Sequence, residues 1–257
     1  MGNGYVLITG ASSGIGFEIA KLFKKDGHNL ILVARDKEKL KGAMDILDNK
    51  ENKIIMLDID LSVEEEINKL IKYINDNKIN IDILVNNAGV GSFGDFIDID
   101  WNIEKRLIDI NINAVTKLTK YFLPKMIESK SGGILNVAST AAFSAGPRMA
   151  TYYASKAYVL NLTEAIYEEV RDYGIKIACL CPGPVRTSFQ DKAGINKSEK
   201  AKKYLMNADI VAKIGYDEFK KGKVIIIPGL KNKVLVNLGK LVPRAISRRV
   251  ILKTNKK

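Results

Sequence analysis

The segment TYYASKAYVL places Tyr152 four residues before Lys156. Residues at this spacing share one face of an α-helix, so the phenol and the amine can converge there. A free phenol has a pKa of about 10, and a neighbouring ammonium group favours the phenolate and lowers that pKa. A shift of roughly three units needs about 4 kcal/mol, which one charge in a poorly solvated cleft can supply. The pair therefore predicts a phenol that exchanges protons near neutral pH.

Spacing alone does not identify the reactive tyrosine. Tyr153 lies three residues before Lys156 and can share the same helix face. A tyrosine and a lysine at such spacings also occur by chance, as a pair that faces solvent. The choice between the two tyrosines therefore rests on other motifs in the chain.

The segment LITGASSGIG also has the residue types for chemistry, because it holds Gly10, Gly14 and Gly16 between an apolar run and a helical pattern. Glycine lets the backbone turn sharply and approach another group closely. The start of the following helix offers free N–H groups and a positive dipole end to a phosphate. We therefore expect a binding loop for the pyrophosphate of a dinucleotide, with a plain tight turn as the alternative.

The end of the next apolar run bears on which dinucleotide is bound. NAD sites usually have a carboxylate there for the ribose hydroxyls, whereas this chain has Ala34 followed by Arg35. A guanidinium suits a 2′-phosphate, so we expect NADP(H) rather than NAD(H). Alternatively, Asp36 caps the next helix and Arg35 is only solvated. Asp60, at the end of the third run, either contacts the adenine amino group or begins a helix.

These motifs lie in an alternation of short apolar runs with longer amphipathic stretches. Strands are predicted at 5–9, 30–34, 54–60, 81–89, 132–139, 175–183 and 223–229, and helices at about 14–26, 36–48, 63–76, 102–127 and 151–172. Right-handed crossovers between such strands give a parallel sheet with helices on both faces. We expect one α/β domain over residues 1–230, with a Rossmann-like, doubly wound, seven-stranded parallel sheet. The polar segment 190–203 is predicted to form a loop or short helices over a cleft.

The net charge of +12 comes from the C-terminal segment. Residues 219–257 contain twelve Lys and Arg and no Asp or Glu, and residues 1–218 hold 29 charges of each sign. Pro243 divides a basic amphipathic extension, residues 231–257, into two short helical candidates. This extension either packs on the domain or on a partner subunit, or lies on an anionic membrane surface. Nucleic acid is not the expected partner, because aromatic residues do not interleave with the basic ones.

Cysteine and histidine usage indicates a reducing compartment and no metal site. The chain has one histidine, His28, which lies in a predicted loop and is expected to be structural. Cys179 and Cys181 are expected to point to opposite faces of a strand, without a mutual disulfide, and no zinc site is expected. We expect no secretory leader before the first strand, and no apolar run approaches the ~18–20 residues that span a bilayer. We therefore predict a cytoplasmic protein, with membrane contact only at its periphery.

Five motifs occur in a fixed order along the chain, namely TGASSGIG, NNAG, the serine of NVAS, YYASK and PGPVRT. As an ordered set over residues 4–230 they resemble the short-chain dehydrogenase/reductase family. The resemblance selects Tyr152, as the first residue of a Tyr-x-x-x-Lys motif, for the general acid/base. It implies that Lys156 holds the nicotinamide ribose and lowers the pKa of the tyrosine. It further implies that Ser139 hydrogen-bonds the substrate oxygen.

The resemblance also assigns the remaining site residues. Asn111 in DININAVT is similar to the family's fourth catalytic residue, which supports a water-linked proton path, and Asn113 is the alternative. The residues implied to contact the cofactor are Thr9, Gly10, Ser12, Ser13, Gly14, Ile15, Gly16, Arg35, Asp60, Asn87, Ala88, Gly89, Tyr152, Lys156, Pro182, Gly183, Val185 and Thr187. A homodimer or homotetramer is expected. Within the family, the chain is most similar to the DltE-like, NADP-dependent bacterial branch.

The expected activity is an NADP(H)-dependent transfer of hydride between the nicotinamide and a small-molecule carbonyl or alcohol. Phe93, Phe143, Met149, Phe189 and segment 190–205 either frame a hydrophobic substrate pocket or belong to the core or an interface. Reduction of a 3-oxoacyl thioester on an acyl carrier protein is the alternative within this class. The alternative outside it is a dinucleotide-binding, membrane-associated scaffold without turnover, which the complete set of catalytic residues disfavours.

Overall fold

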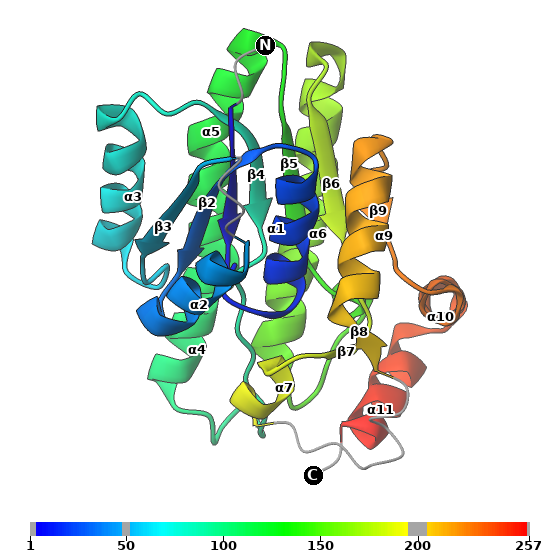
Figure 1. Cartoon of the computed structure of the whole chain (residues 1–257). Coiled ribbons are helices and arrows are strands. Elements are labelled where there is room, and N and C mark those ends of the chain that lie inside the picture. The colour runs from blue at the N-terminus through cyan, green and yellow to red at the C-terminus, as the bar shows by residue number, and fades with distance from the viewer. Residues whose placement is uncertain (1–3, 48–51, 195–204, 256–257) are drawn as a thin grey trace.

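The computed structural model describes residues 4–47, 52–194 and 205–255. Its centre is a sheet of seven strands, all paired in parallel, in the order β3-β2-β1-β4-β5-β6-β9 (Figure 1). The strands are β1 (Tyr5–Thr9), β2 (Asn29–Ala34), β3 (Ile54–Asp58), β4 (Ile81–Asn86), β5 (Gly133–Val137), β6 (Lys176–Leu180) and β9 (Ile225–Ile226). The predicted doubly wound sheet is confirmed. The chain reverses its direction of winding between β1 and β4, where such folds bind their ligands.

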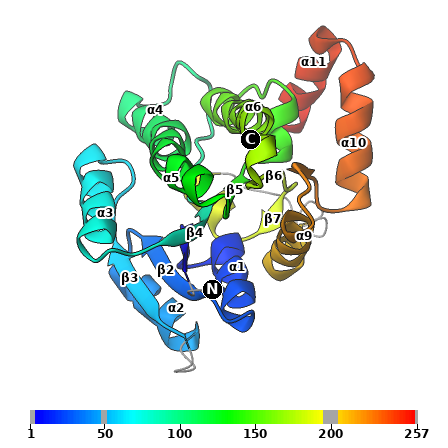
Figure 2. The ribbon, with the colours of Figure 1, turned by 90° about the horizontal axis from the view of Figure 1, so that it is seen from above.

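Helices cover both faces of the sheet, and each layer encloses its own core (Figure 2). One face carries α1 (Gly14–Lys25), α2 (Lys37–Leu47) and α9 (Ala208–Lys220), where Phe23 and Phe219 are fully buried. The other face carries α3 (Glu64–Asp76), α5 (Val115–Ser129) and α6 (Ala150–Val170), where Leu70 and Phe122 are buried. Because both faces are covered, the strands are nearly continuous apolar runs rather than alternating ones.

The region predicted as one long helix is helical throughout but contains a wider turn. It consists of α4 (Trp101–Ile108), a π-helical turn over Asp109–Ala114 and then α5. A π-turn inserts an extra residue into an α-helix and is frequent at functional sites. The turn changes which residues face the sheet, and it carries both candidate asparagines of the sequence analysis.

The C-terminal extension forms two helices beside β9 and α6, at the outer edge of the molecule in Figures 1 and 2. They are α10 (Leu230–Leu241) and α11 (Arg244–Thr254), and Pro243 separates them as predicted. We call α10 and α11 together the C-terminal hairpin. Along the chain, β6 is followed by the short strand β7 (Val185–Arg186), the short helix α7 (Phe189–Lys192) and the short strand β8 (Met206–Asn207), and these two strands pair in parallel. Residues 195–203 of the predicted cleft loop lie outside the described residues.

The two cysteines correct an expectation. Cys179 and Cys181 pack in the same apolar cluster, and their Sγ atoms are 3.6 Å apart. Alternate residues of an extended segment point to the same face, so the expectation of opposite faces was wrong. Both thiols are free and buried. Their position behind Lys156 leaves them in the packed interior rather than at a reactive surface.

His28 lies at the edge of the sheet remote from the glycine loop and packs edge-on against Phe23, with ring centroids 5.5 Å apart. This contact fits the structural role expected for it. None of the helices among the described residues combines the length and the apolar composition of a transmembrane span.

Candidate active site

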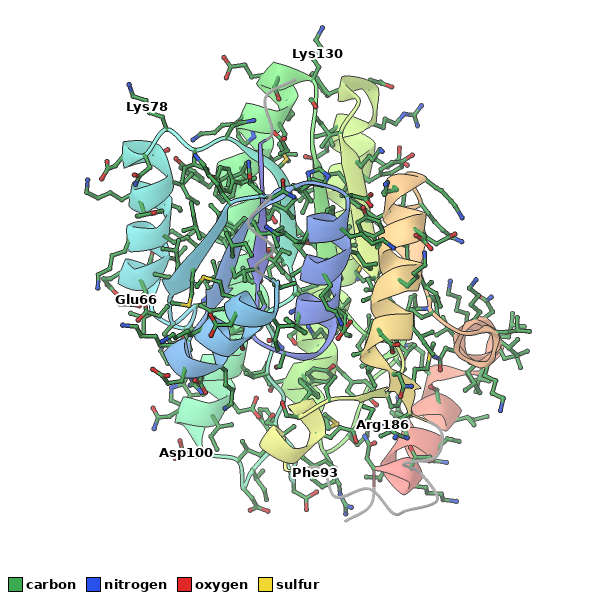
Figure 3. All side chains as sticks on the ribbon, viewed as in Figure 1. Glu66, Lys78, Phe93, Asp100, Lys130 and Arg186 are labelled. Atoms are coloured by element: carbon green, nitrogen blue, oxygen red, sulfur yellow. The ribbon has the colours of Figure 1, made fainter. Side chains whose placement is uncertain are left out.

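The residues singled out from the sequence follow the carboxyl ends of the parallel strands, which point toward the lower half of the molecule in Figure 1. Figure 3 labels Phe93 and Arg186 in this lower half, whereas Lys78 and Lys130 lie near the top. Parallel strands all point the same way, so the loops that follow them meet at one side of the sheet. The glycine loop, the NNAG segment, Ser139 and the PGPVRT segment therefore become neighbours although they are distant in the sequence.

The glycine loop has a backbone that only glycine accommodates easily. Gly10 and Gly14 have φ angles of +65° and +59°. A Cβ atom on Gly10 would lie 2.8 Å from Asn87 Nδ2 and 2.9 Å from Ala88 Cα. A Cβ on Gly16 would overlap the Asn87 side chain. The loop is thus shaped by both left-handed backbone angles and close packing.

Asn87 and Thr9 connect this loop to the NNAG segment. Asn87 Nδ2 donates to the carbonyl oxygens of Thr9 (2.9 Å) and Gly10 (3.1 Å). Thr9 Oγ1 accepts from the backbone N–H groups of Asn87 and Ala88, each at 3.0 Å, and donates to Val85 O at 3.2 Å. These bonds hold the ends of β1 and β4 together and give the loop a defined shape before any ligand arrives.

The start of α1 suits a pyrophosphate. The Ser13 side chain does not cap the helix, and the first backbone hydrogen bond of the helix runs from Phe17 N to Ser13 O. The N–H groups of Gly14, Ile15 and Gly16 belong to the first turn, where they have no intrahelical partner and the helix dipole is positive. Ser13 is exposed and Ser12 half-buried at this turn. The chain therefore presents a cradle that fits the phosphates of a dinucleotide.

Arg35 and Asp36 have different environments at the end of β2. Asp36 accepts hydrogen bonds from the Lys39 backbone N–H (3.1 Å) and from Lys39 Nζ (2.7 Å), which caps the start of α2. Arg35 is exposed and makes no hydrogen bond or ion pair within the described ranges. The helix-capping role left open for Asp36 is therefore what the structure shows, and Arg35 remains a cation that can meet an anionic group.

Asp60 is occupied by residues of this chain. Arg106 Nη2 donates to both of its carboxylate oxygens at 2.9 Å, and Ser62 Oγ donates to Asp60 Oδ1 at 2.7 Å. Burial acts to raise the pKa of Asp60, but the bonds from Ser62 and Arg106 outweigh it and hold that pKa below its usual value. Of the two roles left open, the structure shows Asp60 organising the turn before α3.

Tyr152 and Lys156 lie in the first turns of α6 and are buried, with 9% and 4% of their surfaces exposed. Lys156 Nζ lies 5.9 Å from the centroid of the Tyr152 ring and donates to Val137 O at 3.0 Å. Tyr152 packs with Ala141 and Met149. Tyr153 packs at the margin of this cluster and against Gly146, where a Cβ on that glycine would overlap its ring. Of the two tyrosines, the structure buries Tyr152 within the cluster itself.

The electrostatics of this pair differ from the sequence-based expectation. Burial raises the pKa of Tyr152 to about 12, although the neighbouring Ser139 hydroxyl opposes the rise. Burial also lowers the pKa of Lys156 to about 8. The predicted lowering of the phenol pKa was therefore wrong in direction. Removing the phenolate from water disfavours it strongly, and the amine, which faces the Val137 carbonyl, does not compensate.

Asn111 is fully buried in the π-helical turn and bridges three elements. Its Nδ2 donates to Val90 O (2.9 Å) and Ser155 Oγ (3.0 Å), and its Oδ1 accepts from Val90 N (3.0 Å). A Cβ added to Gly89 would lie 3.1 Å from Lys156 Nζ and 3.4 Å from Asn111 Oδ1, so both side chains border Gly89. Asn113 is exposed and donates to Asp109 instead. The structure thus brings Asn111, and not Asn113, to Lys156.

Ser139 lies immediately after β5, where its Oγ accepts from Ala141 N (3.1 Å) and donates to Pro182 O (3.4 Å). This bond places the PGPVRT segment beside Ser139. A Cβ on Gly14 would lie 3.0 Å from Thr187 Cγ2, so the same segment also reaches the glycine loop. The backbone between these contacts includes Gly183, which packs against Asn232 of α10, and buried Val185 in β7.

The four predicted pocket residues separate into two groups. Phe93, Met149 and Phe189 pack around Tyr152, and the Phe189 ring centroid is 5.4 Å from that of Tyr152. Phe143 instead packs with the cluster on the other side of the loop after Ser139. It borders a different cavity, under the C-terminal hairpin.

Sequence reasoning missed several buried polar side chains near the site. Ser155 Oγ donates to Tyr152 O at 2.7 Å and accepts from Asn111, so it connects the π-turn to α6. Ser92 Oγ donates to Glu104 Oε1 at 2.8 Å, and Glu104 Oε2 is buried without a hydrogen-bond partner among the described residues. Ser155 lies inside the YYASK motif and was within reach of the sequence analysis. Glu104 lies in an ordinary polar helix pattern that carries no such signal.

Comparison with known proteins identifies the class to which this fold and site belong. A family model described as short chain dehydrogenase matches residues 4–198. Oxidoreductase UcpA of Salmonella typhimurium is 38% identical over 186 residues, which cover 72% of this chain and 70% of that protein. The chain therefore belongs to the short-chain dehydrogenase family and is an oxidoreductase of that family.

Two solved structures add the cofactor context. A short-chain dehydrogenase from Sphingobium yanoikuyae in complex with NADPH has a TM-score of 0.82 and 30% identity, covering 94% of this chain and 97% of that one. A short-chain dehydrogenase/reductase from Burkholderia phymatum in complex with NAD also has a TM-score of 0.82, with 25% identity and coverage of 93% of each chain. Membership of the family implies that this chain binds a dinucleotide. The two neighbours differ in which dinucleotide they hold.

Proposed function

We propose that this protein is an NADP(H)-dependent oxidoreductase that interconverts a hydrophobic carbonyl compound and the corresponding alcohol. The observation that carries the proposal is the convergence of Ser139, Tyr152, Lys156 and Asn111 beside a glycine cradle shaped for phosphates. When bound, the nicotinamide supplies or accepts the hydride. The chain's own groups position the substrate oxygen and move the proton.

Tyr152 is the proton donor in the proposed reduction. Its pKa of about 12 keeps the phenol protonated at neutral pH, so the hydroxyl can give its proton to the oxygen of the carbonyl group. The Ser139 hydroxyl lies close enough to that phenol to lower its pKa, and it steadies the same oxygen. Lys156 carries a positive charge below about pH 8 and favours the phenolate that remains. Oxidation of the alcohol reverses these steps.

The choice of NADP(H) rests on Arg35. Its guanidinium is exposed at the end of β2 and has no acidic partner within the described ranges, whereas Asp36 is engaged in capping α2. A planar guanidinium binds a phosphate with paired hydrogen bonds, and its positive charge attracts the negative charge of a 2′-phosphate. The 30%-identical neighbour in complex with NADPH supports the same choice.

The test of this proposal is NADPH oxidation, followed at 340 nm, against a panel of ketones and aldehydes. Tyr152→Phe keeps the ring and removes the acidic proton. We expect turnover to fall by about 10²–10⁴-fold, the usual contribution of a positioned general acid. Tyr158→Phe is the matched control, because it removes the same hydroxyl from an exposed tyrosine of the same helix, and turnover should stay within threefold.

Two results would contradict the assignment. Equal turnover of Tyr152→Phe and the unmodified protein would exclude Tyr152 as the donor. NADPH binding without oxidation of any carbonyl compound would favour the scaffold without turnover. Turnover confined to 3-oxoacyl thioesters would select the acyl-carrier-protein reductase alternative and narrow the substrate class.

Within the family, we propose that the chain belongs to the DltE-like, NADP-dependent bacterial branch.

We further propose that the chain forms a homodimer or homotetramer in the cytoplasm. Apolar side chains are exposed at the start of α4, where Phe96, Ile97, Trp101 and Ile103 have more than half of their surfaces accessible. Exposed apolar clusters of this kind are typical of surfaces that bind another protein. Light scattering of the purified protein measures the assembly directly.

Peripheral membrane contact is proposed for the C-terminal hairpin. It exposes Leu230, Leu241 and Ile246 by 77%, 81% and 52%, in a segment with many Lys and Arg and no acidic residue. Basic amphipathic helices with exposed apolar side chains lie on anionic bilayers. Co-sedimentation with anionic liposomes, lost on deletion of residues 231–257 and absent with neutral liposomes, is the expected result.

A further inference from the structure

A cavity of about 420 Å³ lies between the loop after Ser139 and the C-terminal hairpin. Its walls are mainly apolar, with Phe143 and Tyr153 on the domain side and Leu235, Val236 and Ile251 on the hairpin side. Among the residues that the structure describes, no Asp, Glu, Lys or Arg lines it. The volume lies within the range of roughly 300–1,000 Å³ that small-molecule sites occupy. It is not part of the cluster formed by Tyr152, Met149 and Phe189.

The hairpin covers this cavity and is tied down at its far end. Asn255 Nδ2 donates to Pro147 O at 3.0 Å, and Arg148 Nη1 donates to Asn255 O at 3.1 Å. Near the other end, Val236 is buried and Asn232 packs against Gly183. The middle of the hairpin spans the space between these attachments, and this span leaves the cavity beneath it.

The cavity shares a wall with the proposed catalytic cluster. Ala141 packs with Tyr152 in that cluster and also lines the cavity. Tyr153, another lining residue, has its ring centroid 6.1 Å from that of Tyr152. A molecule that fills the cavity therefore lies one side chain away from the phenol that is proposed to give the proton.

The border of the cavity carries positive charge. Lys240 Nζ lies 5.5 Å from the centroid of the Phe143 ring, so the amine stands over one wall. Residues 219–257 hold no acidic side chain that would neutralise it. An apolar interior with a cationic border matches an amphiphile with an apolar body and an anionic end.

We infer that the cavity under α10–α11 binds the apolar body of the substrate, and that the substrate is an aliphatic carbonyl compound with an anionic end held at Lys240. This inference rests on the proposed oxidoreductase function, because it places the body of that substrate. It assigns the C-terminal hairpin a role in substrate specificity, which the dinucleotide-binding sheet does not supply.

The first experiment measures binding without turnover. Hexanoate, octanoate and decanoate are titrated calorimetrically, below their micellar concentrations, into the full chain with NADPH. Each methylene buried in the cavity contributes about 0.8 kcal/mol, so affinity should rise about fourfold per methylene. A flat dependence on chain length would overturn the inference, whatever the enzyme assays show.

Gly239 allows the cavity to be filled. It lines the cavity in α10, and no heavy atom lies within 4 Å of a Cβ added there. Gly239→Phe should weaken decanoate binding at least tenfold. Gly42→Phe is the matched control, because Gly42 also lies in a helix, α2, with free space around an added Cβ and far from the cavity. Equal effects of the two variants on decanoate affinity would overturn the assignment of the cavity.

Lys240 is tested with a charged and an uncharged ligand of equal length. Lys240→Gln should weaken decanoate binding two- to fivefold and leave 1-decanol binding unchanged, because an exposed ion pair contributes about 0.2–1 kcal/mol. Lys233→Gln, on the same helix and outside the lining, is the control. An equal loss for both ligands would show that Lys240 does not hold the anionic end, and would overturn that part of the inference.

The final experiment connects the cavity to turnover. Decanoate should inhibit NADPH oxidation competitively against an aliphatic carbonyl compound of similar length, with an inhibition constant equal to its dissociation constant. Non-competitive inhibition would show that the cavity lies outside the substrate site and would overturn the inference while leaving the proposed function intact. Unchanged turnover of Tyr152→Phe would defeat the proposed function and leave the binding results as they stand.

Discussion

Polar side chains at the carboxyl edge of the sheet are buried and bonded to residues from distant strands, whereas most side chains of the C-terminal hairpin are exposed. Asn87 holds Thr9 and Gly10, and Asn111 joins Val90 to Ser155. The hairpin is attached to the domain through Asn255 and a few apolar contacts such as Val236. The first region can hold a cofactor and a proton donor in fixed positions. The second can vary its side chains without disturbing them, which suits a region that selects substrates.

The largest expected effect concerns the buried amine. Lys156→Met should reduce turnover about 10³-fold, because the positive charge beside Tyr152 is lost. Burial lowers the pKa of Lys156 from 10.5 to about 8, which corresponds to a cost of about 3 kcal/mol for the charged amine in the folded state. In the variant the Val137 carbonyl loses its hydrogen-bond donor, which costs about 2 kcal/mol and offsets part of the gain from removing the buried charge. We therefore expect the free energy of unfolding of the variant at pH 7 to exceed that of the unmodified protein by about 1 kcal/mol, measured by urea denaturation.

The sign of this effect has its own control. The folded-state pKa of Lys156 lies below that of the unfolded chain, so the unfolded state binds more protons between about pH 8 and 10.5. The stability of the unmodified protein should gain from this group as pH rises through that window. The Lys156→Met variant should lack this gain. A Lys156→Met variant that is both less active and less stable at pH 7 would show that the buried amine stabilises the fold. The contrast between the carboxyl edge of the sheet and the C-terminal hairpin would then not hold.

The second prediction concerns the glycine loop. Gly10→Ala places a Cβ against Asn87 and Ala88 at a φ of +65°, so the loop must shift. NADPH affinity should fall at least 100-fold, measured by fluorescence titration. Gly222→Ala is the matched control, with a φ of +77° and no heavy atom within 4 Å of the added Cβ. Both variants should lose about 1–2 kcal/mol of stability from the left-handed angle, and only Gly10→Ala should lose the cofactor.

The third prediction sharpens the assignment of the cofactor. Arg35→Ala should weaken NADPH binding roughly 10- to 100-fold and change NADH binding less than twofold, since charge-assisted bonds contribute about 1.5–3 kcal/mol each. Lys41→Ala, which removes an exposed cation from the neighbouring helix α2, should alter neither. Equal losses for both cofactors in Arg35→Ala would place the guanidinium away from the 2′-phosphate.

The effect that develops most gradually is a pH dependence. Lys156 is charged below its pKa of about 8 and loses its charge above it, so kcat for carbonyl reduction should fall about tenfold per pH unit above pH 8. Tyr152, with a pKa of about 12, stays protonated over this range, so its ionisation does not change the pH–rate profile. A pH–rate profile from 6 to 10 measures this. A flat profile up to pH 10 would show that the charge of Lys156 does not limit the reaction.

The sequence by itself determined the architecture and much of the site. Apolar runs followed by amphipathic stretches predicted the seven parallel strands, because both repeats are local properties of the chain. Gly10, Gly14 and the Tyr152–Lys156 spacing marked the candidate cofactor loop and the candidate catalytic helix for the same reason. Pro243 marked the division of the C-terminal segment into two helices, since proline has no N–H donor and its ring clashes with the preceding helical turn.

Only the tertiary structure decided which side chains meet and how deeply they are buried. It paired Asp60 with Arg106, chose Asn111 over Asn113, and placed Phe143 at a cavity under the hairpin. It also reversed the expected pKa shift of Tyr152, since that shift depends on burial rather than on spacing along the helix. Contacts between distant elements and the loss of solvent around a group arise from packing of the whole chain, so no local pattern contains them.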